Sequence, residues 1–117
     1  MSDIFPGALS QVADYFKVLS EVSRLQIVYC LKTGAKNVTE IIAETGLGQA
    51  NVSKHLKVLA QAGIVKRTPD GVSVIYEIAD PILFQLCDLV CDACGKRSYH
   101  LAVRLEEQTK QLEQFKL

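Results

Sequence analysis

Four cysteines are the residues of this sequence best suited to chemistry: Cys30, Cys87, Cys91 and Cys94. The last three are four and three residues apart, so on a helix they would share one face and could act together. Three thiolates suit trigonal As(III), and four suit tetrahedral zinc or cadmium, although no cofactor is certain from the sequence. An oxidant or a reactive sulfur species could instead bridge two thiols. The third alternative is inert packing, because free cysteine behaves as a small hydrophobic side chain.

The segment Cys91-Asp92-Ala93-Cys94 has the spacing of a thioredoxin-type redox pair. Such a pair works at a helix N-terminus, where the helix dipole stabilises a thiolate. Here the pair falls far along a predicted helix, and Asp88 and Asp92 oppose the charge of a thiolate. We therefore expect a protein that is not an enzyme, with a thiol oxidoreductase as the remaining alternative.

The length and composition of the sequence indicate a single globular domain over residues 1–117. Hydrophobic residues make up 49% of the chain, which is ample for a buried core. The formal net charge is zero, so any case for nucleic acid must come from the local distribution of charge. There is no secretory leader and no apolar run of membrane length. We therefore expect a cytoplasmic protein that does not bind membranes.

The spacing of apolar residues predicts a series of helices in the first half of the chain. Apolar positions recur every three or four residues over 8–19, 21–32 and 49–62. Asn37 and Glu40 fit a capping box that opens a further short helix. Glycines in Gly46-Leu47-Gly48 then force a turn. Two helices joined by such a turn predict a helix-turn-helix at residues 38–62.

Two β-branched runs follow the helix-turn-helix, at residues 64–67 and 72–78. They are separated by Thr68-Pro69-Asp70-Gly71, in which Asp-Gly is a strong hairpin signal. This hairpin, at residues 64–78, forms a wing. The predicted fold class is therefore mainly α with a small β-hairpin wing, a winged helix-turn-helix.

The C-terminal part of the chain, residues 80–117, is predicted to be helical and to carry three of the cysteines. Asp80 and Pro81 supply an N-cap and a proline at the first helical position. The sequence leaves open whether Gly95 breaks this helix. A sparse apolar stripe continues beyond it, at Leu101, Leu105, Leu112 and Phe115. Because this stripe cannot bury against a core of its own, we expect a homodimer through the N- and C-terminal helices.

The helix over 49–62 and the wing carry the residue types that contact DNA. Short polar side chains reach base edges in the major groove, and flanking cations meet phosphates. The candidate DNA-binding residues are Gln49, Asn51, Ser53, Lys54, His55, Lys57, Arg67 and Ser73. Between Gly46 and Tyr76 the chain has Lys54, Lys57, Lys66 and Arg67 against Asp70, a local charge of +3. The alternative is an ordinary solvated helix face, which would not require a basic wing beside it.

His55 has a structural alternative to its place among these candidates. A half-buried histidine hydrogen-bonded to the backbone would fit the same position. Arg24 is expected to form an ion pair at a helix junction.

Three segments of the sequence carry the pattern of a known family: Leu19-Ser20-Glu21-Val22-Ser23-Arg24-Leu25-Gln26-Ile27, Asn51-Val52-Ser53-Lys54-His55-Leu56-Lys57-Val58-Leu59 and Gly63-Ile64-Val65. Through them, the chain from Val18 to about Ile78 resembles the ArsR/SmtB family of metal- and thiol-responsive repressors. This resemblance implies a homodimer whose first and last helices form the interface. It also implies that two recognition helices read the half-sites of a palindromic double-stranded operator, and that an inducer releases the DNA.

Two inducer sites known in that family, the arsenite type and the zinc type, are absent from this sequence. Arsenite-responsive members carry paired cysteines before the turn, where this chain has Asn37, Val38, Thr39 and Glu40. Zinc-responsive members carry Asp and His ligands along the last helix, where this chain has Asp80, Ile82, Ala93 and Lys96.

The cysteines themselves resemble a different subset of the family. Cys30 with Cys94, or with Cys91, resembles the thiol pair of its persulfide- and redox-sensing members. The function that this implies is a repressor that leaves its operator when cysteine thiols are modified by reactive sulfur species or oxidant. The alternative is release by arsenite or a soft metal bound through Cys87, Cys91 and Cys94.

Overall fold

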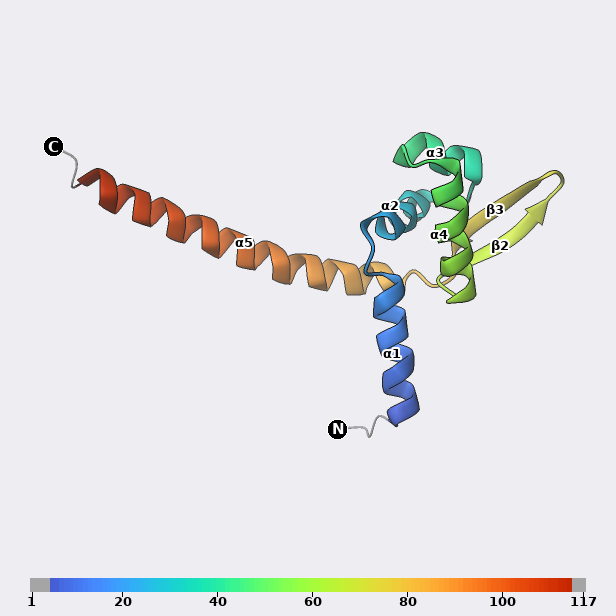
Figure 1. The fold of residues 1–117 in the computed structure, drawn as a ribbon, viewed down its shortest axis with the longest axis horizontal. Helices are drawn as coiled ribbons and strands as arrows, with labels where there is room; N and C mark the ends of the chain where they lie inside the picture. Colours follow the sequence, from blue (N-terminus) through green and yellow to red (C-terminus); the bar gives the residue numbers. More distant parts are fainter. Residues whose placement is uncertain (1–4, 115–117) are drawn as a thin grey trace. The chain divides into compact units, whose positions relative to one another are not determined.

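The computed structural model describes residues 5–114, without the side chains of residues 96–102, 113 and 114. Its elements follow one another as α1 (Pro6–Val18), α2 (Val22–Cys30), a 3-10 turn (Leu31–Thr33), β1 (Lys36–Asn37), α3 (Val38–Thr45), α4 (Gln49–Gln61), β2 (Val65–Asp70), β3 (Ser73–Ile78) and α5 (Ile82–Gln114) (Figure 1). Contacts divide the chain into two compact units, one ending at Asp80 and the other beginning at Pro81. No described helix combines the length and apolarity that a membrane span needs.

The core of the first unit lies where helices α2, α3 and α4 contact one another. The side chains of Ile27, Ile41, Val52, Leu56 and Leu59 are completely buried there. On α4, Val52, Leu56 and Leu59 recur at four- and three-residue spacing, so this helix presents one apolar stripe to α2 and α3. In this packing α3 and α4 form a helix-turn-helix, and the buried stripe determines which face of α4 remains open to solvent.

Both ends of α3 are stabilised by the local groups that the sequence predicts. The backbone N–H of Glu40 donates to Asn37 Oδ1 at 2.9 Å, and the backbone N–H of Asn37 donates to Glu40 Oε1 at 3.0 Å. This reciprocal pair is the expected capping box. At the other end, Gly46 has a φ of 72°, a left-handed conformation that glycine adopts without steric cost. The turn between α3 and α4 is therefore set by local sequence.

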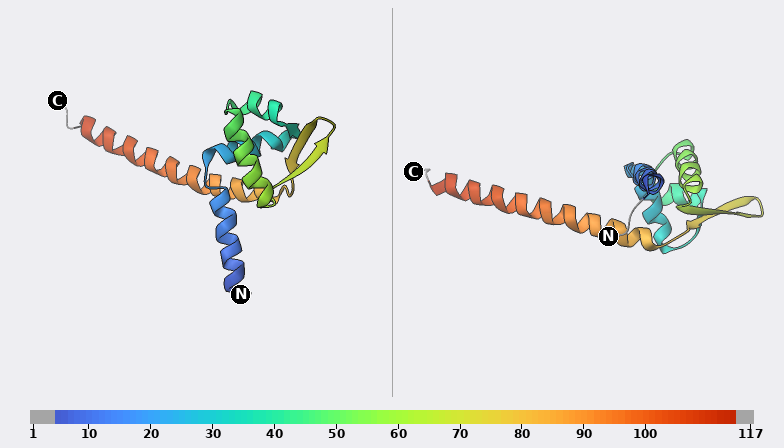
Figure 2. Two further views of the ribbon diagram at one scale, coloured as in Figure 1. Left: turned by 45° about the vertical axis from the view of Figure 1, so that its right-hand side comes forward. Right: turned by 90° about the horizontal axis from the view of Figure 1, so that it is seen from below.

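The sheet has three antiparallel strands in the order β1-β3-β2, one more than the predicted hairpin. The additional strand, β1, pairs Lys36 with Tyr76 and Asn37 with Ile75. Two residues of these types carry no β signal, so only the folded chain reveals this strand. The hairpin of β2 and β3 projects beyond α2–α4 (Figure 2).

The hairpin turn is tighter than the sequence suggested. We expected a turn over 68–71, but β2 continues through Pro69, which faces Val74, and ends at Asp70, which faces Ser73. The loop is thus Gly71-Val72, and Gly71 has a φ of 61°. Pro69 is tolerated because β2 is an edge strand. On its open side no neighbouring strand accepts a hydrogen bond, so a proline that lacks the backbone N–H costs nothing there.

Helix α5 is continuous from Ile82 to Gln114, so Gly95 does not break it. The helix begins one residue after Pro81, which we expected as its first residue. Leu105 and Leu112 are 54% and 67% exposed. This exposure agrees with the expectation that their apolar stripe has no core of its own to pack against. Phe115, which we placed on the same stripe, lies outside the described residues, and so does the side chain of Leu101.

Candidate nucleic-acid interface and thiol sites

The solvent-facing side of α4 carries most of the predicted DNA contacts. Its exposed candidates are Gln49, Asn51, Ser53, Lys54 and Lys57. The buried stripe of α4 points the other way, so these residues share the open side of the helix. The three short polar side chains lie in its first turns, the part of a recognition helix that reaches base edges. Lys54 and Lys57 follow them on the exposed side of the helix, and lysine is a residue type that contacts phosphates.

The wing adds a smaller basic surface. Arg67 and Lys66 of β2 are exposed, and Ser73 at the start of β3 is half-buried. Across the hairpin, Lys66 lies opposite Glu77, which also is exposed. Counting residues 46–77, four cations stand against Asp70 and Glu77, so the local charge is +2. This is lower than the sequence count of +3, because the register places an acid beyond residue 76 against the basic strand.

His55 is the candidate that the structure places apart from the others. His55 is 8% exposed and lies on the buried side of α4. The Nε–H of Arg24 donates to His55 Nδ1 at 3.2 Å, and Glu21 Oε2 lies 3.5 Å from the same nitrogen. Arg24 also forms the expected ion pair, with 3.5 Å between its Nε and Glu21 Oε2. His55 is thus buried and held within the protein, as the structural alternative expected, but its partners are the side chains of Arg24 and Glu21 and not the backbone.

Cys30 is buried at the end of α2, beside a cluster of polar groups that the sequence did not reveal. The thiol is hydrogen-bonded to Glu44, and Lys36 Nζ lies 3.8 Å from Glu44 Oε1. Lys36 Nζ also donates to the Cys30 carbonyl oxygen at 2.6 Å and to Thr33 Oγ1 at 2.7 Å. Burial, and secondarily the Glu44 carboxylate, raises the pKa of the Cys30 thiol to about 11. At neutral pH this thiol is therefore protonated and a poor nucleophile.

The α5 cysteines have a different environment. Cys91 and Cys94 are exposed and Cys87 is half-buried, and none of the cysteines forms a disulfide. On a helix, side chains three or four residues apart have Cβ atoms about 5–6 Å apart, whereas a disulfide needs about 3.5–4.5 Å. Because α5 is intact through Gly95, a direct disulfide between Cys91 and Cys94 of one chain would require the helix to unwind.

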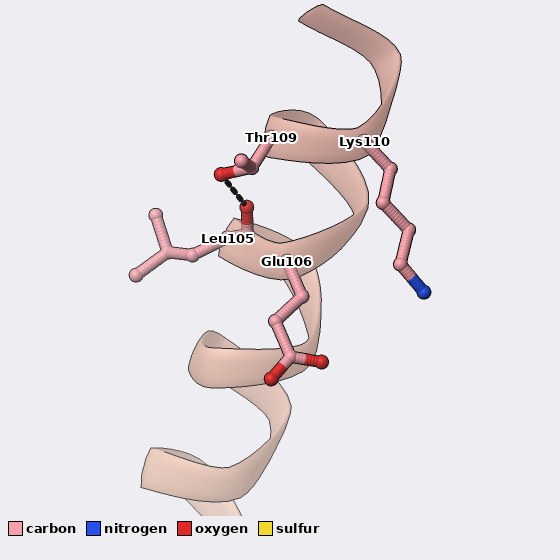
Figure 3. A pocket seen from close by; sticks show the side chains of 4 residues that line it. All are labelled: Leu105, Glu106, Thr109 and Lys110. Atoms are coloured by element: carbon pink, nitrogen blue, oxygen red, sulfur yellow. Dashed lines mark hydrogen bonds between the residues drawn. The ribbon is translucent and has the colours of Figure 1, made fainter. Parts of the chain in front are cut away.

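Neither a metal site nor a ligand cavity is formed by the described residues around these thiols. Among the described side chains, no group of three or more His, Cys, Asp or Glu residues is arranged to hold a metal ion. A shallow hollow on α5 is lined by Leu105, Glu106, Thr109 and Lys110 (Figure 3). Its one drawn hydrogen bond, from Thr109 Oγ1 to the Leu105 carbonyl oxygen at 2.8 Å, is internal to the helix. None of the candidate site residues lines it.

Comparison with known proteins identifies the family of this chain. Residues 21–67 match the family described as "Bacterial regulatory protein, arsR family". The transcriptional regulator NmtR of Mycobacterium tuberculosis is 36% identical over 81 residues, which are 69% of this chain and 68% of NmtR. The chain belongs to the ArsR family. It is therefore a DNA-binding transcriptional regulator and not an enzyme, which confirms the resemblance seen in the sequence.

Solved structures of relatives confirm the fold class. The homodimeric winged helix-turn-helix DNA-binding domain of Mb0332 from Mycobacterium bovis has 31% identity and a TM-score of 0.72, and the match covers 86% of this chain and 93% of that one. The crystal structure of Rv0081 from M. tuberculosis has 28% identity and a TM-score of 0.73, over 85% of this chain and 99% of that one.

The sequence matches are shorter than the curated relatives themselves. The matched segment spans 66% of the length of the uncharacterized regulator Rv0081. It spans 60% of a Streptomyces lividans relative, 31% identical over 78 residues, which is named a probable mercury resistance operon repressor. The family thus includes a repressor named for metal resistance.

Proposed function

We propose that this ArsR-family regulator is a repressor that reads a palindromic operator with α4 and the β2–β3 wing. The exposed polar and basic side of α4, opposite its buried stripe, is the observation that carries this proposal. Gln49, Asn51 and Ser53 contact base edges, and the cations contact phosphates. The phosphate contacts are those of Lys54, Lys57 and Arg67, with Ser73 beside them on the wing. His55 is excluded from the set because its side chain is buried.

A homodimer is the form in which two copies of α4 would reach two half-sites. Helix α1 has no buried residue, and its apolar side chains Leu9, Val12 and Phe16 are 54%, 45% and 49% exposed. Leu105 and Leu112 leave a similar stripe exposed on α5. Amphipathic helices with open apolar faces favour a partner surface, and the Mb0332 relative is homodimeric. The dimer would act in the cytoplasm, where operator DNA is found.

We further propose that the thiols of α5 receive the inducing signal. Cys91 and Cys94 are exposed to reagents, and Cys87 shares their face one turn earlier. With a polysulfide, a thiolate attacks a sulfur atom, the S–S bond breaks, and the shortened polysulfide leaves with the electron pair. When the adduct carries two added sulfur atoms, a thiolate of the second cysteine attacks the inner one, the bond to the terminal sulfur breaks, and that sulfur leaves as hydrosulfide. The product is a trisulfide, which joins the two cysteines without the short Cβ separation of a disulfide. The bridge would shift α5 and misalign the two copies of α4.

The second candidate is a repressor released by arsenite or a soft metal. Three thiols on one face, two of them exposed, are the observation that favours it, because As(III), zinc and cadmium take thiolate ligands. Such an ion would need ligands from a second copy or a local change in α5, since the described side chains of one chain form no such site. Cys30 would contribute little to either candidate as the first thiol to react, because it is protonated and buried.

Release of DNA, followed together with intact mass, tests the proposal and separates the two candidates. The probe is a fluorescein-labelled duplex selected from a random library with the reduced protein, titrated with sodium polysulfide, arsenite or cadmium. Release by polysulfide with added sulfur mass supports the thiol switch, and release by an ion without covalent change supports the metal candidate. Cys91→Ser and Cys94→Ser should abolish release while DNA affinity is retained. The matched variant Cys30→Ser loses release only if Cys30 is the second thiol of the bridge.

A further inference from the structure

One part-buried contact joins α4 to the junction between α1 and α2. The guanidinium of Arg24 donates through Nε to His55 Nδ1 at 3.2 Å and through Nη1 to the carbonyl oxygen of Val18 at 3.2 Å. Val18 is the last residue of α1, Arg24 lies in the first turn of α2, and His55 is in the middle of α4. Glu21 Oε2 lies 3.5 Å from both Arg24 Nε and His55 Nδ1. We refer to Glu21, Arg24 and His55 as the clasp.

The direction of the hydrogen bond fixes the chemical state of His55. An arginine N–H can only donate, so His55 Nδ1 must offer a lone pair and carry no proton. The imidazole in the clasp is therefore neutral, with its proton on Nε2. A proton added to Nδ1 would remove the acceptor and place an imidazolium against a guanidinium. The carboxylate of Glu21 is the only described group near that nitrogen able to accept the new N–H.

We propose that Arg24 is a positioning residue for DNA binding, which holds α4 in place through neutral His55 and releases it when His55 is protonated. The proposal rests on the assignment of α4 as the recognition helix. The charged groups bonded to His55 are Glu21 and Arg24, both from the start of α2. Two other elements, α3 and β2, also pack on α4. Among the described residues, neither of them supplies an ionisable partner for His55.

The direction in which DNA affinity changes on protonation of His55 distinguishes the clasp from simple charge attraction. Histidine gains its positive charge between pH 8 and pH 5, and a positive charge alone would strengthen attraction to phosphates. Loss of the Arg24 bond would instead loosen α4 and weaken binding. We expect operator affinity to fall roughly three- to tenfold between pH 7.5 and pH 5.5, which corresponds to one net hydrogen bond.

The tautomer of His55 gives the most direct test, since it requires no substitution. Protein labelled with ¹⁵N at histidine should show His55 at pH 7.5 with an unprotonated Nδ1 and a protonated Nε2. A reference spectrum of His100→Gln assigns the signals, because the chain has two histidines. The opposite tautomer, or a charged imidazole at pH 7.5, would overturn the proposal.

Binding measured against pH tests the functional consequence, with the selected duplex as the probe and His100→Gln as the background. His55→Asn keeps an uncharged oxygen acceptor for Arg24, so its affinity should remain independent of pH. Arg24→Ala should bind weakly at both pH values. A wild-type affinity that stays constant or rises as the pH falls would overturn the proposal, and so would an unchanged pH profile in His55→Asn. If instead Lys57→Ala bound as tightly as the background protein, the assignment of α4 to DNA would fail rather than the clasp.

Discussion

Cys30 should be the slowest of the four thiols to react, by a factor that follows from its surroundings. Its pKa is raised from 9.0 to about 11 by burial and by the hydrogen bond and charge of Glu44. Two pKa units leave about 100-fold less thiolate at pH 7.5, and only the thiolate is nucleophilic. Cys30 is also 8% exposed, which restricts access further. We therefore expect alkylation of Cys30 to be at least about 100-fold slower than that of Cys91.

Timed alkylation measures this difference. Reduced protein is treated with iodoacetamide at pH 7.5, quenched with acid and digested, and the modified peptides are quantified by mass spectrometry. Glu44→Gln removes the carboxylate charge but leaves the burial, which is the larger cause of the raised pKa. That variant should react several-fold faster at Cys30 and remain slower there than at Cys91. In urea all four cysteines should react at similar rates, which controls for the local sequence.

Alkylation of Cys30 in folded wild-type protein at a rate within tenfold of that of Cys91 would contradict protection of this thiol by burial and Glu44. Such a result would mean that the end of α2 opens readily, and Cys30 would then be as accessible to an inducer as the α5 thiols. Slow alkylation would leave Cys91 and Cys94 as the thiols that an inducer meets first.

Three further predictions concern charge, capping and pH. Lys57→Ala should weaken binding to all DNA sequences alike and lower the slope of log K against log salt by about 1 in a salt titration, whereas Asn51→Ala should alter sequence preference. Asn37→Ala removes the α3 cap and should lower the free energy of unfolding in urea by about 1 kcal/mol. Because the unfolded chain gives up the Cys30 proton near pH 9 and the folded chain near pH 11, stability should fall between these values in wild type but not in Cys30→Ser.

Much of the fold follows from local patterns that the sequence displays directly. Apolar spacing along 21–32 and 49–62 reports which helix faces are buried, because a helix repeats every 3.6 residues wherever it packs. Asn37 and Glu40 bond to each other three residues apart, and Gly46 takes its left-handed conformation locally. A few adjacent residues therefore determine the cap of α3 and the turn of the helix-turn-helix. The family pattern lies in the same segments, which is why the DNA-binding class was predictable.

Other features depended on residues that are distant in sequence. Strand β1 exists because Lys36 and Asn37 meet β3 about 40 residues later, and two residues have no pattern of their own. His55 carries the same sequence signal as its exposed neighbours, yet its contact with Arg24 spans 31 positions. The raised pKa of Cys30 likewise comes from burial and from Glu44 on another helix. A sequence specifies which groups are present, but desolvation and partner choice arise only when the chain closes around them.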